Sequence, residues 1–201
     1  MIESNGTVHL SEIVFCTLSP LDFFAYKGLR TEALNSKDSR SFVACSPSEL
    51  SRTDAEWKNV CTPVFDSDGK GLRSGVGAFY YGEKSKPLLV GSALTELWSR
   101  DMSGKTAFYR AIYVRPEFRN MGIGEQIERQ QDVWAINNGY EKAVFTVRAD
   151  KYEWLERQKK TFGAEIRESM ELTYANGDHA LTYLLQRQFF SARVNRCLAL
   201  V

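Results

Sequence analysis

The alternation of apolar and polar positions divides the chain into two kinds of segment. Alternating or continuous apolar residues predict strands, at residues 7–19, 75–82, 88–98, 105–114, 141–149, 165–174 and 179–187. Apolar residues that recur every three or four positions predict helices, at residues 19–36, 46–60, 124–137 and 150–163. The predicted order is therefore β-α-α-β-β-β-α-β-α-β-β, without an internal repeat.

Residues at the ends of the predicted helices support these limits. Ser19 can cap the first helix, and Ser46 with Glu49 forms a capping-box pattern for the second. Asn138-Gly139 ends the third helix, because glycine adopts the left-handed conformation after a helix at little cost. Asp150 is expected to cap the fourth helix and Gly163 to stop it. Two sets of apolar residues are expected to face the core, namely Leu50, Trp57 and Val60, and Ile123, Ile127, Val133 and Trp134.

The connections between the strands predict the fold class. A strand, a helix and a strand within 105–149 imply parallel pairing through a right-handed crossover. The short turns within 75–98 and 165–187 imply antiparallel hairpins, the second at Asn176-Gly177. We expect an α/β protein with a mixed sheet of about seven strands and helices on both faces. One domain spans residues 1–188, followed by a tail at 189–201.

Composition and charge exclude several classes of protein. The net charge of +1 gives no sign of a nucleic-acid partner. The first residues lack the pattern of a signal peptide, and no apolar run is long enough for a membrane helix, so a cytoplasmic protein without a membrane partner is expected. The four cysteines and two histidines are scattered along the chain, namely Cys16, Cys45, Cys61, Cys197, His9 and His179. This spacing predicts free thiols and no metal site.

Two glycines stand where the third helix begins. Gly122 and Gly124 follow Arg119 at the end of a predicted strand. Such glycines can serve a loop that needs positive φ, or they can let an anion approach the unpaired N–H groups of a helix start. Arg119 can add a charge-assisted hydrogen bond to that anion. A Walker A loop is absent, and a dinucleotide fingerprint is disfavoured because the third glycine is missing and the stretch comes late in the chain.

The segment YVRPEFRNMGIGEQI resembles the acyl-CoA-binding motif of the GNAT superfamily of N-acetyltransferases, whose core is [Q/R]-x-x-G-x-[G/A]. Arg119, Gly122 and Gly124 match its three fixed positions, and the strand ending at Val114-Arg115-Pro116 is similar to the family pattern. The order of elements fits the family across residues 7–187.

The resemblance implies acetyl-CoA as co-substrate. Its pyrophosphate would lie on the N–H groups of Asn120, Met121, Gly122, Ile123 and Gly124, with Arg119 beside it. Its pantetheine arm would run between two strands that splay apart, bonded to the backbone of Ile112, Tyr113 and Val114. The acceptor, a primary amine of a small molecule or a peptide, would enter from the opposite side, between the early helices and the hairpin at 165–187.

The match fails at the family's usual acid. The family often places a tyrosine four residues before a Gly-Phe pair, but here Lys159 precedes Gly163-Ala164. Tyr152 is the substitute candidate, with packing on the sheet edge as its alternative, and Lys159 is expected to be a solvated helix residue. Glu96 is the candidate base, directly or through water, with a surface carboxylate as its alternative.

Three further features stay open at this stage. Tyr109 and Tyr113 are expected to share one strand face and can line the acceptor pocket. Arg110 needs an anion, and a structural carboxylate is favoured over a substrate carboxylate. The tail can form an amphipathic segment that packs on the domain itself or on a second subunit, so monomer and homodimer both remain. The predicted function is acetyl transfer from acetyl-CoA to an amine; the alternative is an acyl-CoA-binding sensor or scaffold without catalysis.

Overall fold

The computed structural model describes residues 9–42, 46–82, 86–174 and 178–189. The strands are β1 (Ile13–Thr17), β2 (Val64–Phe65), β3 (Gly71–Tyr80), β4 (Leu88–Leu97), β5 (Thr106–Val114), β6 (Lys142–Arg148), β7 (Glu165–Thr173) and β8 (His179–Gln188). The α-helices are α1 (Phe23–Asn35), α2 (Ser46–Leu50), α3 (Asp54–Cys61), α4 (Ile123–Asn137) and α5 (Tyr152–Phe162). Short 3-10 turns are η1 (Leu10–Glu12), η2 (Pro20–Asp22), η3 (Lys37–Ser41) and η4 (Pro116–Phe118).

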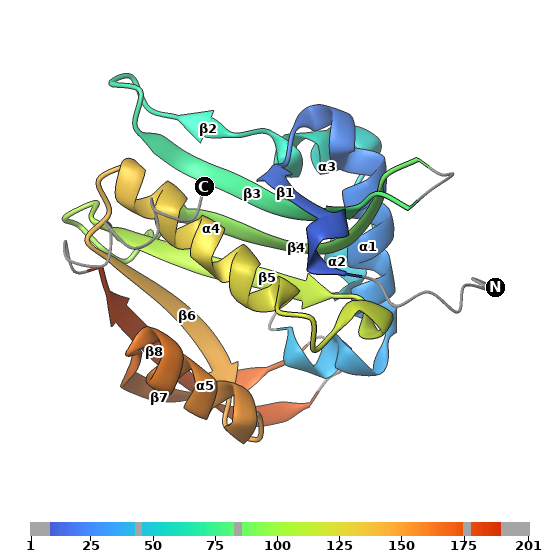
Figure 1. Cartoon of the computed structure of the whole chain (residues 1–201). Coiled ribbons are helices and arrows are strands. Elements are labelled where there is room, and N and C mark those ends of the chain that lie inside the picture. Colours follow the sequence, from blue (N-terminus) through green and yellow to red (C-terminus); the bar gives the residue numbers. More distant parts are fainter. Residues whose placement is uncertain (1–8, 43–45, 83–85, 175–177, 190–201) are drawn as a thin grey trace.

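All strands belong to one sheet, with the order β1-β3-β4-β5-β6-β8-β7 and the short β2 paired to β3 (Figure 1). Among the strands of the described residues, only β5 and β6 pair in parallel, and every other pair is antiparallel. The predicted mixed sheet with a parallel crossover is therefore confirmed. The sheet has eight strands because β2, too short to show an alternating pattern, adds one to the predicted seven.

The parallel pair separates soon after it forms. Register partners run only from Thr106–Lys142 to Phe108–Val144, although β5 continues to Val114. Figure 1 shows β5 and β6 diverging beyond that point. The second half of β5 thus has one edge paired to β4 and the other facing an opening in the sheet.

Helices cover both faces of the sheet, as predicted. One apolar cluster joins α1 and α3 to the sheet through residues such as Leu29, Trp57 and Leu94. Two further clusters hold α4 and α5 on the opposite face, around Ile127 and Leu155. The α4 helix is the crossover between β5 and β6, and it lies in front of the sheet in Figure 1.

The predicted helix 46–60 is wrong as a single element. The chain forms α2 and then a new helix, α3, which starts at the Thr53–Glu56 capping box. The hydroxyl of Thr53 accepts from the Glu56 N–H at 3.3 Å, and the Glu56 carboxylate accepts from the Thr53 N–H at 2.6 Å. Leu50 ends α2 with 38% of its surface exposed, so its expected place in the core is also wrong, whereas Trp57 is buried.

The predicted ends of the other helices are partly confirmed. Asn138-Gly139 and Gly163 end their helices with glycines at φ 76° and 64°, as expected. Ser19 caps the η2 turn that leads into α1. Asp150 does not cap α5, because Lys151 holds that position and the Asp150 carboxylate pairs with Arg148 instead. The Asn176-Gly177 turn lies outside the described residues, although β7 and β8 pair antiparallel.

A bulge in β5 overturns the expected shared face of Tyr109 and Tyr113. Ala111 has φ 58°, and the register with β4 shifts between Ser92 and Leu94. An extra residue in one strand turns the following side chains to the other face. Tyr109 consequently faces α4 and Tyr113 faces α1. Of the tail, only Phe189 is described, and it packs against the cluster beneath α4 and α5.

Candidate acyl-CoA site

The loop between β5 and α4 turns sharply twice before the helix begins. Asn120 has φ 62° and Gly122 has φ 81°, both in the left-handed region. Gly122 is the N-cap of α4, and no side chain caps the helix there. The first helical bond runs from the Gln126 N–H to the Gly122 carbonyl, so the preceding N–H groups have no acceptor within the helix. This arrangement leaves donors and the positive helix end available to an anion.

The two glycines of this loop have different physical reasons. Gly122 needs its positive φ, which other residues adopt only with strain. Gly124 lies inside α4 without a positive φ, and a Cβ there would meet only Val114 Cγ2, at 3.9 Å. Neither strain nor crowding explains a residue that is about 0.5–1 kcal/mol worse than alanine in a helix. The backbone at Gly124 therefore lacks a side chain for which the chain itself has room.

Arg119 closes the loop against the end of β5. Its Nε donates to the Val114 carbonyl at 2.9 Å, and its guanidinium lies 5.6 Å from the centre of the Tyr113 ring. These contacts fix the charge beside the start of α4. The half-buried arginine thus stands next to the N–H groups with which it was predicted to act.

The end of β5 faces the opening in the sheet and is braced from α1. Ile112, Tyr113 and Val114 lie beyond the last register pair with β6. Glu32 of α1 accepts from the Tyr113 hydroxyl at 3.2 Å and pairs with Arg115 at 3.1 Å. The cofactor-binding residues predicted from the sequence therefore form one contiguous unit, the strand end 112–114 and the loop 119–124.

The candidate base and Arg110 lie together, on the α1 side of the sheet. Arg110 Nη2 contacts Glu96 Oε2 at 2.9 Å, and about a third of each side chain is exposed. The structural carboxylate that was expected to pair with Arg110 is therefore that of Glu96, the candidate base. Burial raises the pKa of Tyr26 of α1 to about 12, and the nearby guanidinium of Arg110 opposes this rise. The pair occupies the face opposite α4, just before the bulge at Ala111.

The candidate acid is far more exposed than the candidate base. Tyr152 is the first residue of α5 and has 67% of its surface exposed. Lys159 pairs with Glu156 at 2.9 Å on the same helix, in line with its expected place in solvent. Along the chain, Tyr152 follows β6, which ends at Arg148.

A largely buried charged cluster between α4, α5 and the sheet was not predicted from the sequence. Glu128 pairs with Arg157 at 2.6 Å and accepts from Gln158 at 2.8 Å. Asp132 pairs with Arg187 at 2.5 Å and accepts from the Tyr109 hydroxyl at 2.9 Å. We call these six residues the α4–α5 cluster; they join α4 to α5, β8 and β5 where β5 and β6 part. One feature of the sequence could have indicated this cluster: Glu128 and Asp132 lie one helical turn apart, next to the predicted core residue Ile127.

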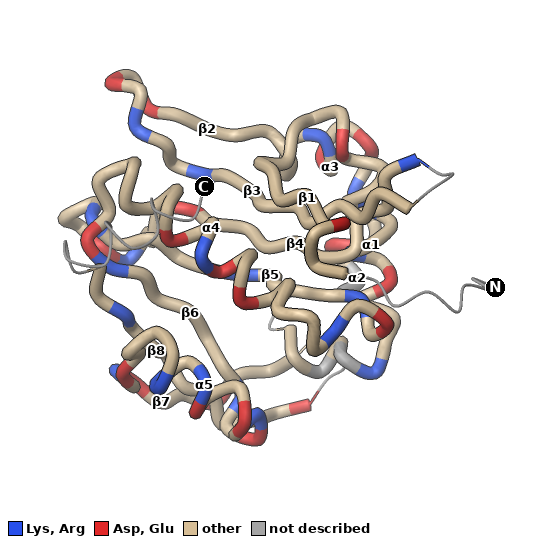
Figure 2. Tube along the Cα trace, in the orientation of Figure 1, with Lys and Arg blue, Asp and Glu red and all other residues tan. Residues whose placement is uncertain are grey.

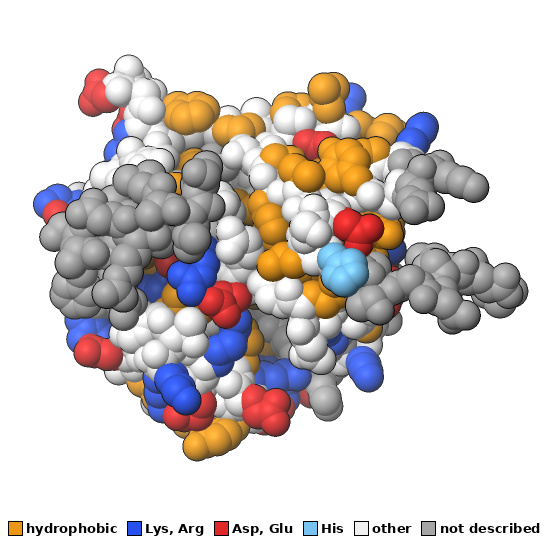
Figure 3. Space-filling view, viewed as in Figure 1, with side chains coloured by type: hydrophobic (Ala, Val, Ile, Leu, Met, Phe, Trp, Pro, Cys, Tyr) orange, Lys and Arg blue, Asp and Glu red, His pale blue; other side chains and the backbone are white. Residues whose placement is uncertain are grey.

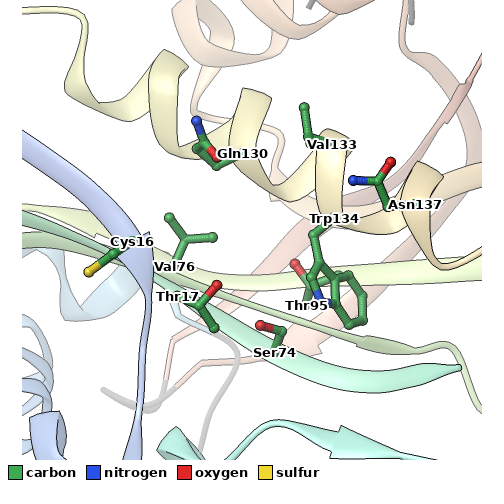
Figure 4. A pocket seen from close by; sticks show the side chains of 9 residues that line it. All are labelled: Cys16, Thr17, Ser74, Val76, Thr95, Gln130, Val133, Trp134 and Asn137. Atoms are coloured by element: carbon green, nitrogen blue, oxygen red, sulfur yellow. The ribbon is translucent and has the colours of Figure 1, made fainter. Parts of the chain in front are cut away.

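A separate cavity of about 190 Å³ lies between the second half of α4 and the strands β1, β3 and β4 (Figure 4). Trp134 points from α4 towards the strands that carry Ser74 and Thr95. The lining is Cys16, Thr17, Ser74, Val76, Thr95, Gln130, Val133, Trp134 and Asn137. This lining contains no Lys or Arg to bind an anion, and no Asp or Glu, so the cavity is not the predicted anion site.

The predictions about free thiols, metal ligands and membrane helices can be compared with the described residues. Cys16 is exposed and Cys61 is buried, both as free thiols, while Cys45 and Cys197 lie outside the described residues. Within the described ranges, no three His, Cys, Asp or Glu side chains gather as metal ligands. None of the helices described here has the length and apolarity that crossing a bilayer demands.

Solved structures place this fold among known acetyltransferases. A GNAT-family acetyltransferase from Streptococcus pneumoniae matches with a TM-score of 0.70 and 17% identity, over 89% of this chain and all of that one. A GCN5-related N-acetyltransferase from Kribbella flavida matches at 0.67 and 12%, over 89% and 99%. The protein yncA from Salmonella typhimurium, solved with acetyl-CoA, matches at 0.63 and 13%, over 89% and 95%. At these identities the likeness concerns the fold.

The family follows from the sequence. The model of the acetyltransferase (GNAT) family matches residues 31–155, from the last part of α1 to the start of α5, and this range includes the whole loop 119–124. The chain therefore belongs to the GNAT acetyltransferase family. No curated protein sequence matches the chain.

Proposed function

We propose that the protein is an N-acetyltransferase that moves an acetyl group from acetyl-CoA to a primary amine of a small molecule or a protein. The observation that carries this proposal is Gly124, whose missing side chain nothing within the chain requires. A phosphate on the N–H groups of residues 120–124 gives the glycine a reason, and Arg119 supplies a cation beside it. The yncA structure, which holds acetyl-CoA on a similar fold, supports this choice of ligand.

The opening between β5 and β6 suits an extended ligand. Beyond Phe108 the edge of β5 lacks a β6 partner, so backbone groups of Ile112, Tyr113 and Val114 can bond a pantetheine arm as they would bond a strand. Such an arm would start at the loop 119–124 and end near the bulge at Ala111. The reacting carbonyl would then lie close to Arg110 and Glu96, on the α1 side.

Glu96 is the proposed proton acceptor for the attacking amine, directly or through water. Arg110 holds one of its oxygens and so fixes the position of the carboxylate. Tyr152 is the proposed proton donor to the departing thiolate. That step needs little help, because a thiol has a pKa of about 8.5.

One observation favours a second function, an acyl-CoA-binding sensor or scaffold. Tyr152 is mostly exposed, and Lys159 stands in place of the tyrosine usual in similar proteins. Under this alternative the loop 119–124 would bind acetyl-CoA and no acetyl group would be transferred.

Calorimetric titration with acetyl-CoA, CoA and ATP, followed by a free-thiol assay over a panel of amines, separates the possibilities. Binding of both CoA species with amine-dependent thiol release is expected. Glu96→Gln should bind acetyl-CoA as the unchanged protein does and turn over at least about tenfold more slowly, given the usual worth of a general base. Asp68→Asn, which removes an exposed carboxylate from the turn between β2 and β3, is the matched control.

Each failure has a separate meaning. Binding without release of thiol for any amine would favour the sensor. An unchanged rate for Glu96→Gln across the pH range would contradict Glu96 as the base. No binding of either CoA species would reject the acyl-CoA site altogether.

A further inference from the structure

The strands at the two ends of the sheet order, β1 and β7, differ in their side chains. β7, at one edge, has four charged residues among nine, Glu165, Arg167, Glu168 and Glu171. β1, at the other edge, reads Ile-Val-Phe-Cys-Thr and has none. Figure 2 shows β1 without a charged residue along its length. Charges on an edge strand hinder pairing with another chain, so β7 is protected in this way and β1 is not.

The surroundings of β1 are apolar as well. Val14 on β1 is 48% exposed, and near the two ends of the strand Leu10 is 44%, Leu21 91% and Phe24 67% exposed. Figure 3 shows hydrophobic side chains gathered over the region where Figure 1 places β1 and the start of α1. Isolated apolar side chains on a surface are ordinary, but several around an unprotected edge strand mark an interaction surface.

We propose that β1 pairs antiparallel with β1 of a second copy of this chain, which makes the protein a twofold homodimer with a sheet continuous across both subunits. A second copy fits for two reasons. An antiparallel strand edge is self-complementary, since its N–H and C=O groups face those of its own copy across a twofold axis. The absence of charge on β1 also removes the repulsion that like charges directly opposite would cause, which β7 would meet through its three glutamates.

The geometry of such pairing has one definite consequence. If all five residues of β1 pair with those of the second copy, Phe15 lies opposite Phe15 and Val14 lies opposite Cys16 of that copy. Opposite residues share a face of the sheet, so exposed Val14 and exposed Cys16 would meet each other. Leu21 and Phe24, which are exposed beyond the end of β1, would add apolar area that five strand residues alone do not supply.

Sedimentation velocity of the full chain over a wide concentration range tests the proposal, and a concentration-dependent dimer is expected. Val14→Lys should weaken the dimer at least about tenfold, because a lysine blocks a strand edge. Ile166→Lys is the matched control, an apolar residue 42% exposed on the opposite edge strand, and it should leave the dimer unchanged. Circular dichroism and acetyl-CoA titration verify that both variants fold.

A cross-link tests the register independently. Val14→Cys with oxidised glutathione should give a disulfide-linked dimer on a non-reducing gel, and Val14→Cys with Cys16→Ser should not. A monomeric protein at all concentrations would overturn the proposal. So would a dimer that Val14→Lys and Ile166→Lys affect equally, or a cross-link that survives the loss of Cys16. The result does not depend on acetyl transfer, so its failure would leave the proposed function untouched.

Discussion

The α4 helix bears two polar regions that are built in opposite ways. At its start, the N–H groups of residues 120–124 have no acceptor within α4, and Gly124 has room for a side-chain methyl group that it lacks. One to two turns later, Glu128 and Asp132 are enclosed and held by Arg157 and Arg187. Both regions are polar, yet the donors of the first have no acceptor within the helix, whereas the charges of the second pair with one another.

The two regions are expected to differ in what they contribute, ligand binding in one and stability of the fold in the other. Buried charges that pair within the chain cost desolvation and stabilise only while both partners remain. Backbone donors left at a helix start cost less and give an anion a place to bind. We therefore expect substitutions in the α4–α5 cluster to change stability, and substitutions in the loop 119–124 to change the affinity for acetyl-CoA.

The largest effect is expected from Arg187→Met. Arg187 is 2% exposed, contacts Asp132 at 2.5 Å and lies 4.4 Å from the centre of the Phe162 ring. Its loss leaves the Asp132 carboxylate without its ion-pair partner and Glu128 with Arg157 alone, which costs about 3–5 kcal/mol of unfolding free energy. Urea unfolding measures the loss, and calorimetry should show unchanged acetyl-CoA affinity for the folded variant. A stable variant that binds poorly would reverse the assignment of the two regions.

Gly124→Glu should abolish acetyl-CoA binding, by at least about a hundredfold or about 2.7 kcal/mol, because a carboxylate would face the phosphates. Gly124→Ala is the sharper variant. A methyl group fits the chain itself, so it should raise the unfolding free energy by about 0.5–1 kcal/mol while it weakens binding. Titration and urea unfolding of both variants test this. Full affinity in Gly124→Ala would contradict the phosphate cradle.

The pH dependence of stability should arise from the α4–α5 cluster. Burial raises the pKa of Asp132 and of Glu128, against the opposing effect of the nearby arginines. The folded state then holds these protons more tightly than the unfolded state, so stability falls as pH rises from about 4, the usual carboxyl pKa, through the raised values. Without Arg187 the pKa values rise further.

The cost of Arg187→Met should accordingly be largest near neutral pH and shrink in acid, by about 1.4 kcal/mol for each pKa unit gained. Urea unfolding of both proteins from acid to neutral pH measures the difference. A cost that does not change with pH would mean that the carboxylates are not what Arg187 stabilises.

Most of the fold could be predicted from the sequence because periodicity reports which residues are buried. The parallel crossover, the antiparallel hairpins and the glycine-terminated helices all follow from local pattern. The errors occur where a non-local contact or a local cap decides. The bulge at Ala111 leaves no mark on the alternation of 105–114, and the Thr53 cap divides a segment whose apolar spacing continues through it.

The candidate site divides in the same way. The left-handed turn at Gly122 could be predicted because glycine marks a backbone conformation directly, whereas the binding role of the loop 119–124 stays a prediction. The Glu96–Arg110 pair and the α4–α5 cluster depend on side chains from strands and helices far apart in sequence. Single-sequence reasoning could name Glu96 and Arg110 separately, but not that they are partners.

Arg119 should show a smaller effect that links the loop to β5. Arg119→Ala removes a charge next to the proposed phosphate, which should weaken acetyl-CoA binding about tenfold, or about 1.4 kcal/mol. Arg119→Lys keeps the charge but lacks the Nε that donates to Val114. If the charge alone matters, the lysine variant binds like the unchanged protein and its affinity falls with added salt. If Arg119 also fixes the loop through Val114, both variants weaken binding, and the lysine variant weakens it less. Equal binding by all three proteins in calorimetry would remove Arg119 from the site and leave the backbone N–H groups at the start of α4 as the proposed donors to the phosphates.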